Sequence, residues 1–219
     1  MNSAALQPWL EHFGIAVSAV TGVLAARGKR IDLFGVLVLA LVTAFGGGTV
    51  RDVLVGEPVA WLRTPAFLFN ATATALAAFF IARVRDLPRG VLLVADASAL
   101  ALFTLIGTRK GVALGFPPPV GVLLGVVTGV AGGIVRDVLT GEVPLVFQSE
   151  IRLYATAALL GAAAFTTLQA AGLDESVATF AGMTVVLALR LAGIRWKISL
   201  PVLAAHPHRD SLPKNDSSP

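Results

Sequence analysis

The sequence contains no cysteine, a single tyrosine, three histidines and only 14% charged residues among its 219 positions. The absence of cysteine excludes disulfide bonds, thiolate metal ligands and cysteine nucleophiles. Soluble domains carry charge on roughly a quarter of their residues, so charge is scarce here. Hydrophobic residues instead make up 56% of the chain, and the mean hydropathy is +0.81. A soluble fold of this size could not bury so much apolar surface. The composition therefore excludes a soluble enzyme, a disordered chain and a nucleic-acid-binding module, and it predicts an integral membrane protein.

Apolar stretches long enough to cross a bilayer recur along the chain. A membrane-spanning helix needs roughly 17–25 mostly apolar residues. Candidate spans run approximately over residues 10–26, 33–50, 65–82, 90–108, 120–135, 153–171 and 176–192. The sequence thus predicts an all-α integral membrane protein with seven transmembrane helices.

Lysine and arginine residues are distributed unevenly between the predicted loops. Cytoplasmic loops of membrane proteins are enriched in these residues, which also accounts for the net charge of +4. With the N-terminus outside, the inner loops and the C-terminal tail hold Arg27, Lys29, Arg30, Arg83, Arg85, Arg89, Arg152, Arg190, Arg195, Lys197, Arg209 and Lys214. The outer loops hold only Arg63, Arg109 and Lys110. We therefore expect the N-terminus outside and the C-terminus in the cytoplasm.

One segment occurs twice. Residues 46–57 and 131–142, here called the first and second motifs, share Gly-Gly-x-Val-Arg-Asp-Val-Leu-x-Gly-Glu at an offset of 85 positions. The motifs end the second and fifth spans, so each repeat holds three spans, and the second copy is expected to be inverted in the membrane. The predicted division is an N-terminal segment at 1–9, a three-helix repeat at 10–85, an inverted repeat at 86–172, a seventh helix at 173–196 and a polar, disordered cytoplasmic tail at 197–219.

Consecutive glycines stand in both motifs, as Gly46, Gly47 and Gly48 in the first and as Gly132 and Gly133 in the second. Glycine costs about 1 kcal/mol relative to alanine in a helix. The run therefore predicts a kink or break, which is tolerated in a membrane only where the backbone is buried in protein or lines a cavity. The alternative is that the glycines merely allow helices to pack closely. Because the run precedes Arg-Asp in both motifs, we favour an ion pathway.

The Arg-Asp pairs of the motifs, Arg51 with Asp52 and Arg136 with Asp137, are costly at membrane depth. Adjacent helical residues point about 100° apart, which argues against pairing within each dipeptide. Pseudo-symmetry leads to the hypothesis that Arg51 pairs with Asp137 and that Arg136 pairs with Asp52. The alternative is that all four lie at the membrane interface, where long side chains reach water.

Asp96 lies in the fourth span among apolar residues, without a basic neighbour in the sequence. An isolated intramembrane carboxylate is a functional-site candidate, which would attract a cation or titrate in a proton-coupled step. The alternative is a carboxylate within reach of the interface. Ser98 adds polarity to the same span and is matched with Ser18 of the first span. The first span offers only an alanine or a nearby serine opposite Asp96, so this charge is predicted to break the pseudo-symmetry.

Patterns typical of enzymes and metal sites are missing from the sequence. His12, His206 and His208 lie near the chain ends without the spacing of a metal site. Phosphate loops, nucleophile elbows and metalloprotease motifs are also absent. We therefore expect no enzymatic activity, no cofactor and no metal beyond transient monovalent cations.

The doubled motif and the arrangement of three, three and one spans resemble the prokaryotic trimeric intracellular cation (TRIC) channels, a sequence group also labelled as a glycine transporter domain. The resemblance covers about residues 10–195. It implies an inner-membrane homotrimer with a pore for monovalent cations, chiefly potassium, within each subunit. The implied partners are further copies of the chain, membrane lipids and K⁺ or Na⁺ in the pore, with no nucleic acid.

In that family the glycine-kinked second and fifth helices line the pore. Carried over to this sequence, the pathway would include Gly46, Gly47, Gly48, Arg51, Ser98, Gly132, Gly133 and Arg136, with Asp52, Asp96 and Asp137 offsetting the basic charge. Two features depart from the family. Ala131 replaces the first glycine of the second motif, and Arg-Asp-Val stands where animal members have Lys-Glu-Val.

A second hypothesis belongs to a different class of protein. Inverted repeats with broken helices are frequent in secondary transporters. The alternative is therefore a carrier that moves a small solute such as glycine by alternating access. The family resemblance favours the channel.

Overall fold

The computed structural model describes residues 3–85, 88, 90–148 and 153–196. They form α1 (Ser3–Ala25), α2 (Leu33–Leu54), α3 (Ala60–Arg63), α4 (Pro65–Val84), α5 (Gly90–Ala113), α6 (Pro118–Leu139), the 3-10 helix η1 (Leu145–Phe147), α7 (Tyr154–Ala170) and α8 (Glu175–Trp196). The predicted disordered tail at 197–219 lies outside the described residues.

The prediction of an all-helical membrane protein is confirmed. Every predicted span coincides with one helix, and α2, α4, α5, α6 and α8 are long and apolar enough to cross a membrane. The crossing of all seven long helices stays a prediction. Helix α1 begins at Ser3, inside the predicted N-terminal segment, because helix-forming residues precede the strictly apolar stretch.

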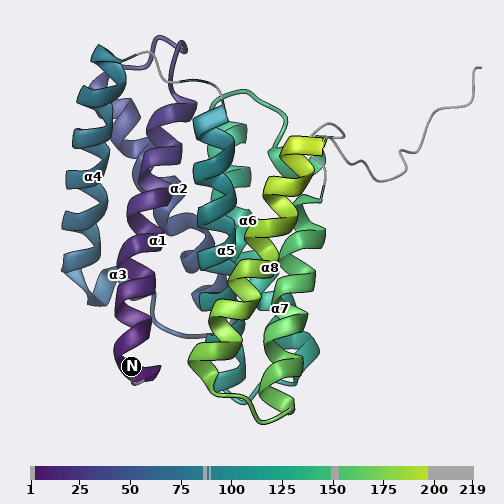
Figure 1. Cartoon of the computed structure of the whole chain (residues 1–219). Coiled ribbons are helices and arrows are strands. Elements are labelled where there is room, and N and C mark those ends of the chain that lie inside the picture. The colour runs from purple at the N-terminus through teal and green to yellow at the C-terminus, as the bar shows by residue number, and fades with distance from the viewer. Residues whose placement is uncertain (1–2, 86–87, 89, 149–152, 197–219) are drawn as a thin grey trace, which may run out of the picture.

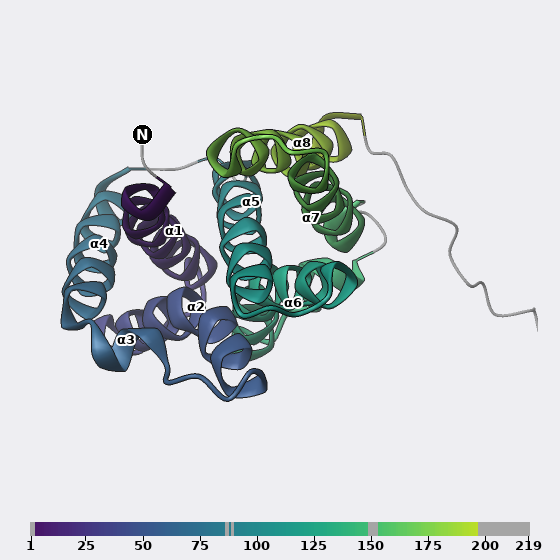
Figure 2. The same cartoon turned by 90° about the horizontal axis from the view of Figure 1, so that it is seen from below.

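The long helices run side by side as a bundle (Figure 1). Viewed nearly along the helix axes, α1, α2, α3 and α4 form one group, and α5, α6, α7 and α8 form the other (Figure 2). The groups meet where α1 packs against α5 and α2 packs against α6. The first and second motifs therefore end the two helices that cross at the centre of the molecule.

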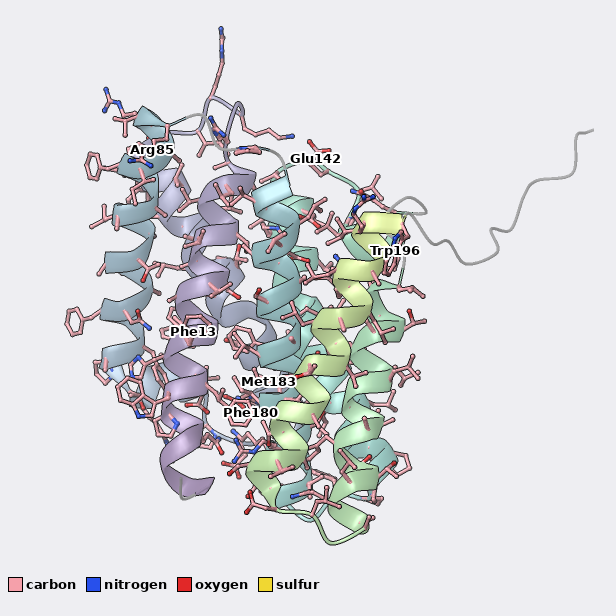
Figure 3. All side chains as sticks on the ribbon, viewed as in Figure 1. Phe13, Arg85, Glu142, Phe180, Met183 and Trp196 are labelled. Carbon is pink, nitrogen blue, oxygen red and sulfur yellow. The ribbon has the colours of Figure 1, made fainter. Side chains whose placement is uncertain are left out.

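The two motif helices run in opposite directions. An ion pair joins Lys29, just before α2, to Glu142, just after α6. At the other end of the bundle, Lys110 near the end of α5 pairs with Asp52 near the end of α2. Figure 3 shows Arg85, Glu142 and Trp196 at one end of the bundle, and the N-terminus lies at the opposite end (Figure 1).

Local sequence signals account for where the motif helices begin and end. Asp32 precedes α2, and its carboxylate accepts a hydrogen bond of 2.8 Å from the backbone nitrogen of Gly35. Pro118 opens α6, where its missing N–H costs nothing. Gly56 and Gly141 follow the two helices with φ of 70° and 71°, a left-handed conformation that glycine adopts without strain. The two motifs therefore share their local structure as well as their sequence.

The sequence predicts a kink or a break at the glycines. Helices α2 and α6 run without a break through their motifs, and a kink within them stays a prediction. The glycines also pack closely, as the alternative interpretation holds. A methyl group added at Gly132 would lie 2.5 Å from the carbonyl oxygen of Thr43, and one added at Gly47 would overlap the carbonyl oxygen of Thr128. Because Thr43 and Gly47 precede Thr128 and Gly132 by the same 85 positions, the contact is reciprocal.

Candidate functional site

In each motif the arginine pairs with the aspartate that follows it, and not with the aspartate of the other motif. Arg51 Nε donates to Asp52 Oδ1 at 2.8 Å, and Arg136 Nε donates to Asp137 Oδ1 at 2.8 Å. The predicted cross-repeat pairs are therefore wrong. Since α2 and α6 are antiparallel, their charged ends lie at opposite ends of the bundle, and the long arginine stem lets each guanidinium turn back to its neighbour.

All four of these charged side chains are buried inside the bundle. The second carboxylate oxygen of Asp52 accepts from the backbone nitrogen of Ala60 at 3.0 Å. Asp137 does the same with the backbone nitrogen of Leu145 at 2.9 Å. Each aspartate thus anchors its arginine and also the loop that follows its motif.

Asp96 has three partners that its sequence neighbourhood does not show. Its Oδ1 accepts from Arg136 Nη1 at 2.8 Å and from the Tyr154 hydroxyl at 3.3 Å. Its Oδ2 lies 3.7 Å from Arg190 Nη2. Tyr154 and Arg190 were not predicted as site residues. The signals that could have found them are that Tyr154 is the only tyrosine of the chain and that Arg190 interrupts an apolar span.

A small cavity lies next to Asp96 and Arg136, where α1, α2, α5 and α6 meet and Tyr154 of α7 completes the lining. We call it the Asp96 cavity. Its other polar lining consists of hydroxyl groups and backbone glycines, from Ser18, Thr21, Thr43, Thr128, Gly47, Gly48, Gly129, Gly132 and Gly133. Gly46 does not line it. Ser98 does not line it either, because its hydroxyl donates to the carbonyl oxygen of Val94 at 3.0 Å. The predicted pathway role of Ser98 is therefore not supported by its position.

A second cavity with a mostly apolar lining, the Glu11 cavity, adjoins the first, because Ala44, Gly48 and Phe103 line both. Its charged lining is Glu11, Arg51 and Asp52. Together the cavities extend from the Asp52 end of α2 past the glycine crossing to Arg136, near the end of α6.

The two cavities are related by the repeat. Glu11 precedes Asp96, and Arg51 precedes Arg136, by the same 85 positions. The prediction that Asp96 has no acidic counterpart is therefore wrong. The prediction aligned Ser18 of the first span with Ser98 of the fourth span. The 85-residue offset of the motifs instead aligns Ser18 with Phe103.

This arrangement can hold small ions along the bundle. Each cavity combines a carboxylate with a guanidinium, and the Asp96 cavity adds hydroxyls and closely approached backbone carbonyls. Intramembrane charges of this kind mark ion or substrate pathways. No group of His, Cys, Asp and Glu among the described residues has the geometry of a metal site. The fold and the site therefore define an apolar helical membrane protein with charged and hydroxyl groups at two adjoining internal cavities.

Comparisons with known proteins identify the family. The family model described as "Glycine transporter" matches residues 8–83 and 93–170. The UPF0126 inner membrane protein YadS of Escherichia coli K12 is 44% identical over 202 residues, which cover 90% of this chain and 95% of YadS. A UPF0126 membrane protein of Vibrio cholerae is 43% identical over 197 residues, covering 89% of this chain and 82% of that protein. The chain belongs to this glycine transporter family of membrane proteins.

Solved structures of the same fold are cation channels. The TRIC trimeric intracellular cation channel orthologue from Rhodobacter sphaeroides is 38% identical and superimposes with a TM-score of 0.83, over 88% of this chain and 99% of that channel chain. A second TRIC cation channel is 31% identical with a TM-score of 0.81, over 91% of this chain and 98% of its own. The predicted resemblance to prokaryotic TRIC channels is confirmed.

Proposed function

We propose that this protein is a channel for monovalent cations, chiefly potassium, and has no enzymatic activity. The observation that carries the proposal is the pair of adjoining cavities, each lined by a carboxylate and an arginine, at the crossing of α2 and α6. The similarity to solved TRIC cation channels supports it. Sodium or potassium would occupy the pathway only in transit.

The lining residues have distinct roles in this proposal. The carboxylates of Glu11 and Asp96 offset the arginines that would otherwise repel cations. The threonine hydroxyls and the carbonyls at the glycine crossing replace part of the hydration shell of the ion, as oxygen ligands do in other cation pores. Phe103 lies where the cavities adjoin, so we assign it to the constriction between them.

The membrane arrangement is proposed from the loop charges and the helix directions. All seven long helices cross the inner membrane, as two inverted three-helix units at 10–85 and 86–172 with a further helix at 173–196. The antiparallel course of α2 and α6 supports the inversion. The end that carries Arg27, Arg83 and Arg85 faces the cytoplasm, so the N-terminus is outside.

We further propose a homotrimer with one pathway inside each subunit and with lipids bound around it. The trimeric R. sphaeroides orthologue supports the assembly. The mass of the protein in detergent-free nanodiscs is expected to correspond to three copies of the chain. A mass of one copy would contradict the proposed homotrimer.

A second candidate is a glycine carrier that works by alternating access. It is favoured by the description of the matching family and by the frequency of inverted repeats in transporters. In a carrier, the cavities open to one side of the membrane at a time. In a channel, the two cavities connect to each other and to both sides of the membrane at the same time.

Single-channel recording on the purified protein in planar bilayers distinguishes the two candidates. Discrete currents in potassium chloride, with a reversal potential near that of potassium under a salt gradient, support the channel. Saturable uptake of labelled glycine into proteoliposomes, without unitary currents, would replace it by the carrier. A preparation inactivated by heat controls for leaks.

A further inference from the structure

Arg190 is the most deeply buried cation of α8, the helix that follows the two predicted three-helix repeats. Its side chain is 0% exposed. Its guanidinium carbon lies 4.4 Å from the centre of the Tyr154 ring, and its Nη2 lies 3.7 Å from Asp96 Oδ2. Helix α8 thus places a positive charge directly against the carboxylate of the Asp96 cavity.

This guanidinium is held without hydrogen bonds in the described part of the chain. None of its three nitrogens has an acceptor there, and Asp96 Oδ2 likewise has no donor. Two other buried cations are fixed differently: Arg136 donates to two carboxylates at 2.8 Å, and Arg51 donates to Asp52 at 2.8 Å. A buried charge without hydrogen bonds is costly. Within the described residues, Arg190 is therefore a buried cation that an ion pair and a ring contact hold in place of hydrogen bonds.

Charge balance shows what Arg190 does at this site. Arg136 and Arg190 supply two positive charges, which Asp96 and Asp137 neutralise. An additional cation at Asp96 would leave the buried cluster with a surplus positive charge, which the low-dielectric interior disfavours strongly. Withdrawal of Arg190 would leave a deficit of one positive charge and a carboxylate oxygen, Oδ2, without a partner.

We propose that Arg190 is a tethered cation that occupies the place of a permeating monovalent cation at Asp96. When α8 carries the guanidinium away from the Tyr154 ring, Asp96 Oδ2 becomes a ligand for potassium or sodium. Helix α8 then controls occupancy of the Asp96 cavity. This inference rests on the proposed cation pathway and adds the site of its regulation.

The test compares potassium flux into proteoliposomes for variants at this site. Arg190→Gln removes the tethered charge and is expected to raise flux severalfold, whereas Arg190→Lys keeps the charge and is expected to stay near the parent. Arg195→Gln, an exposed cation on the same helix, is the matched control and leaves flux unchanged. The gain should disappear in Arg190→Gln combined with Asp96→Asn. A gain that survives without the Asp96 carboxylate, or no gain in a folded Arg190→Gln protein, overturns the proposal.

A second pair of variants covers the case in which Arg190→Gln does not fold. Tyr154→Leu removes the ring beneath the guanidinium and is expected to raise flux, whereas Tyr154→Phe keeps the ring and changes flux less. Equal flux in Tyr154→Leu and Tyr154→Phe would contradict the proposal that the Tyr154 ring holds the Arg190 guanidinium in place.

Thermal unfolding in potassium chloride against choline chloride tests the site independently of transport. Potassium should stabilise Arg190→Gln or Tyr154→Leu more than the parent protein, and equal stabilisation contradicts the proposal. If no preparation passes cations, the proposed channel fails, while this comparison still decides whether Arg190 excludes a cation from Asp96.

Discussion

Gly47 and Gly132 face each other across the centre of the molecule: a methyl group on either would lie 3.6 Å from the backbone nitrogen of the other. Each would also meet a carbonyl oxygen of the opposite helix. The contact lies on the pseudo-symmetric crossing of α2 and α6 and sets how closely the walls of both cavities approach. It explains why both motifs carry glycine at these positions.

Gly47→Ala is expected to destabilise the protein, because the added methyl group overlaps the Thr128 carbonyl. Overpacking of this kind costs about 1–3 kcal/mol, so thermal unfolding in detergent should occur at a clearly lower temperature. Gly48→Ala is the matched control, since the nearest atom to its methyl group is 3.8 Å away on Arg51. Equal losses at the two positions would contradict the close crossing.

Asp52→Asn should destabilise the protein severely. It leaves Arg51 buried without its carboxylate and weakens the bond to Lys110. Breaking a buried ion pair costs about 3–5 kcal/mol, measurable as loss of folded protein after detergent extraction. Glu142→Gln removes an exposed ion pair with Lys29 and should cost less than about 1 kcal/mol. A mild effect at Asp52 would refute its anchoring role.

Asp96→Asn is expected to reduce cation flux and to raise the share of current carried by chloride. Without this carboxylate, Arg136 and Arg190 leave the cavity with surplus positive charge. Reversal potentials under a potassium chloride gradient report the change. Ser98→Ala, on the same helix but outside the cavity lining, should behave as the parent. Unaltered selectivity in Asp96→Asn would remove this residue from the pathway.

Phe103→Ala should increase unitary conductance, because the aromatic side chain lies where the two cavities adjoin. Phe79→Ala is a suitable comparison: this phenylalanine packs around the core of the first helix group and lines neither cavity. Conductance that falls, or stays the same, in a folded Phe103→Ala protein would place the constriction elsewhere.

The absence of cysteine makes membrane orientation directly measurable. Leu62 in α3 and Val84 at the end of α4 are 65% and 78% exposed, and they lie at opposite ends of α4. Leu62→Cys should react with a membrane-impermeant maleimide in intact cells, and Val84→Cys should react only after the membrane is opened. The reverse pattern would invert the proposed topology.

Much of the fold followed from the sequence, because membrane helices are dictated by long apolar stretches. The spans and the doubled motif were visible without coordinates. The sequence did not distinguish a helix break at the glycines from close packing, since propensity describes an isolated helix, whereas the Gly47–Gly132 contact is a property of two helices. The same limitation affected the charge pairs. The angle between neighbouring helical side chains argued against an ion pair between Arg51 and Asp52. The long arginine side chain nevertheless lets the guanidinium turn back to the aspartate.

The candidate site was predicted only in part. Asp96 was identified as an isolated intramembrane carboxylate and Arg136 as a costly charge, and the structure brings them together from different helices. Glu11 was missed because it stands at the start of an apolar stretch, where a carboxylate is expected to face water at the membrane interface. Tyr154 and Arg190 were missed because their contact with Asp96 depends on how α7 and α8 dock. Ser98 was included because its residue type fits, although its hydroxyl bonds to its own helix.

The exchange of ion pairs between the two helix groups has a consequence for biogenesis. Asp52 is made long before Lys110, and Lys29 long before Glu142, since chains fold from the N-terminus during synthesis. Helices α1 to α4 are therefore made before Lys110 and the second motif, which complete the ion pairs of Asp52 and cover the glycine face of α2. The contacts that close the centre of the molecule form only after the second half of the chain has been made.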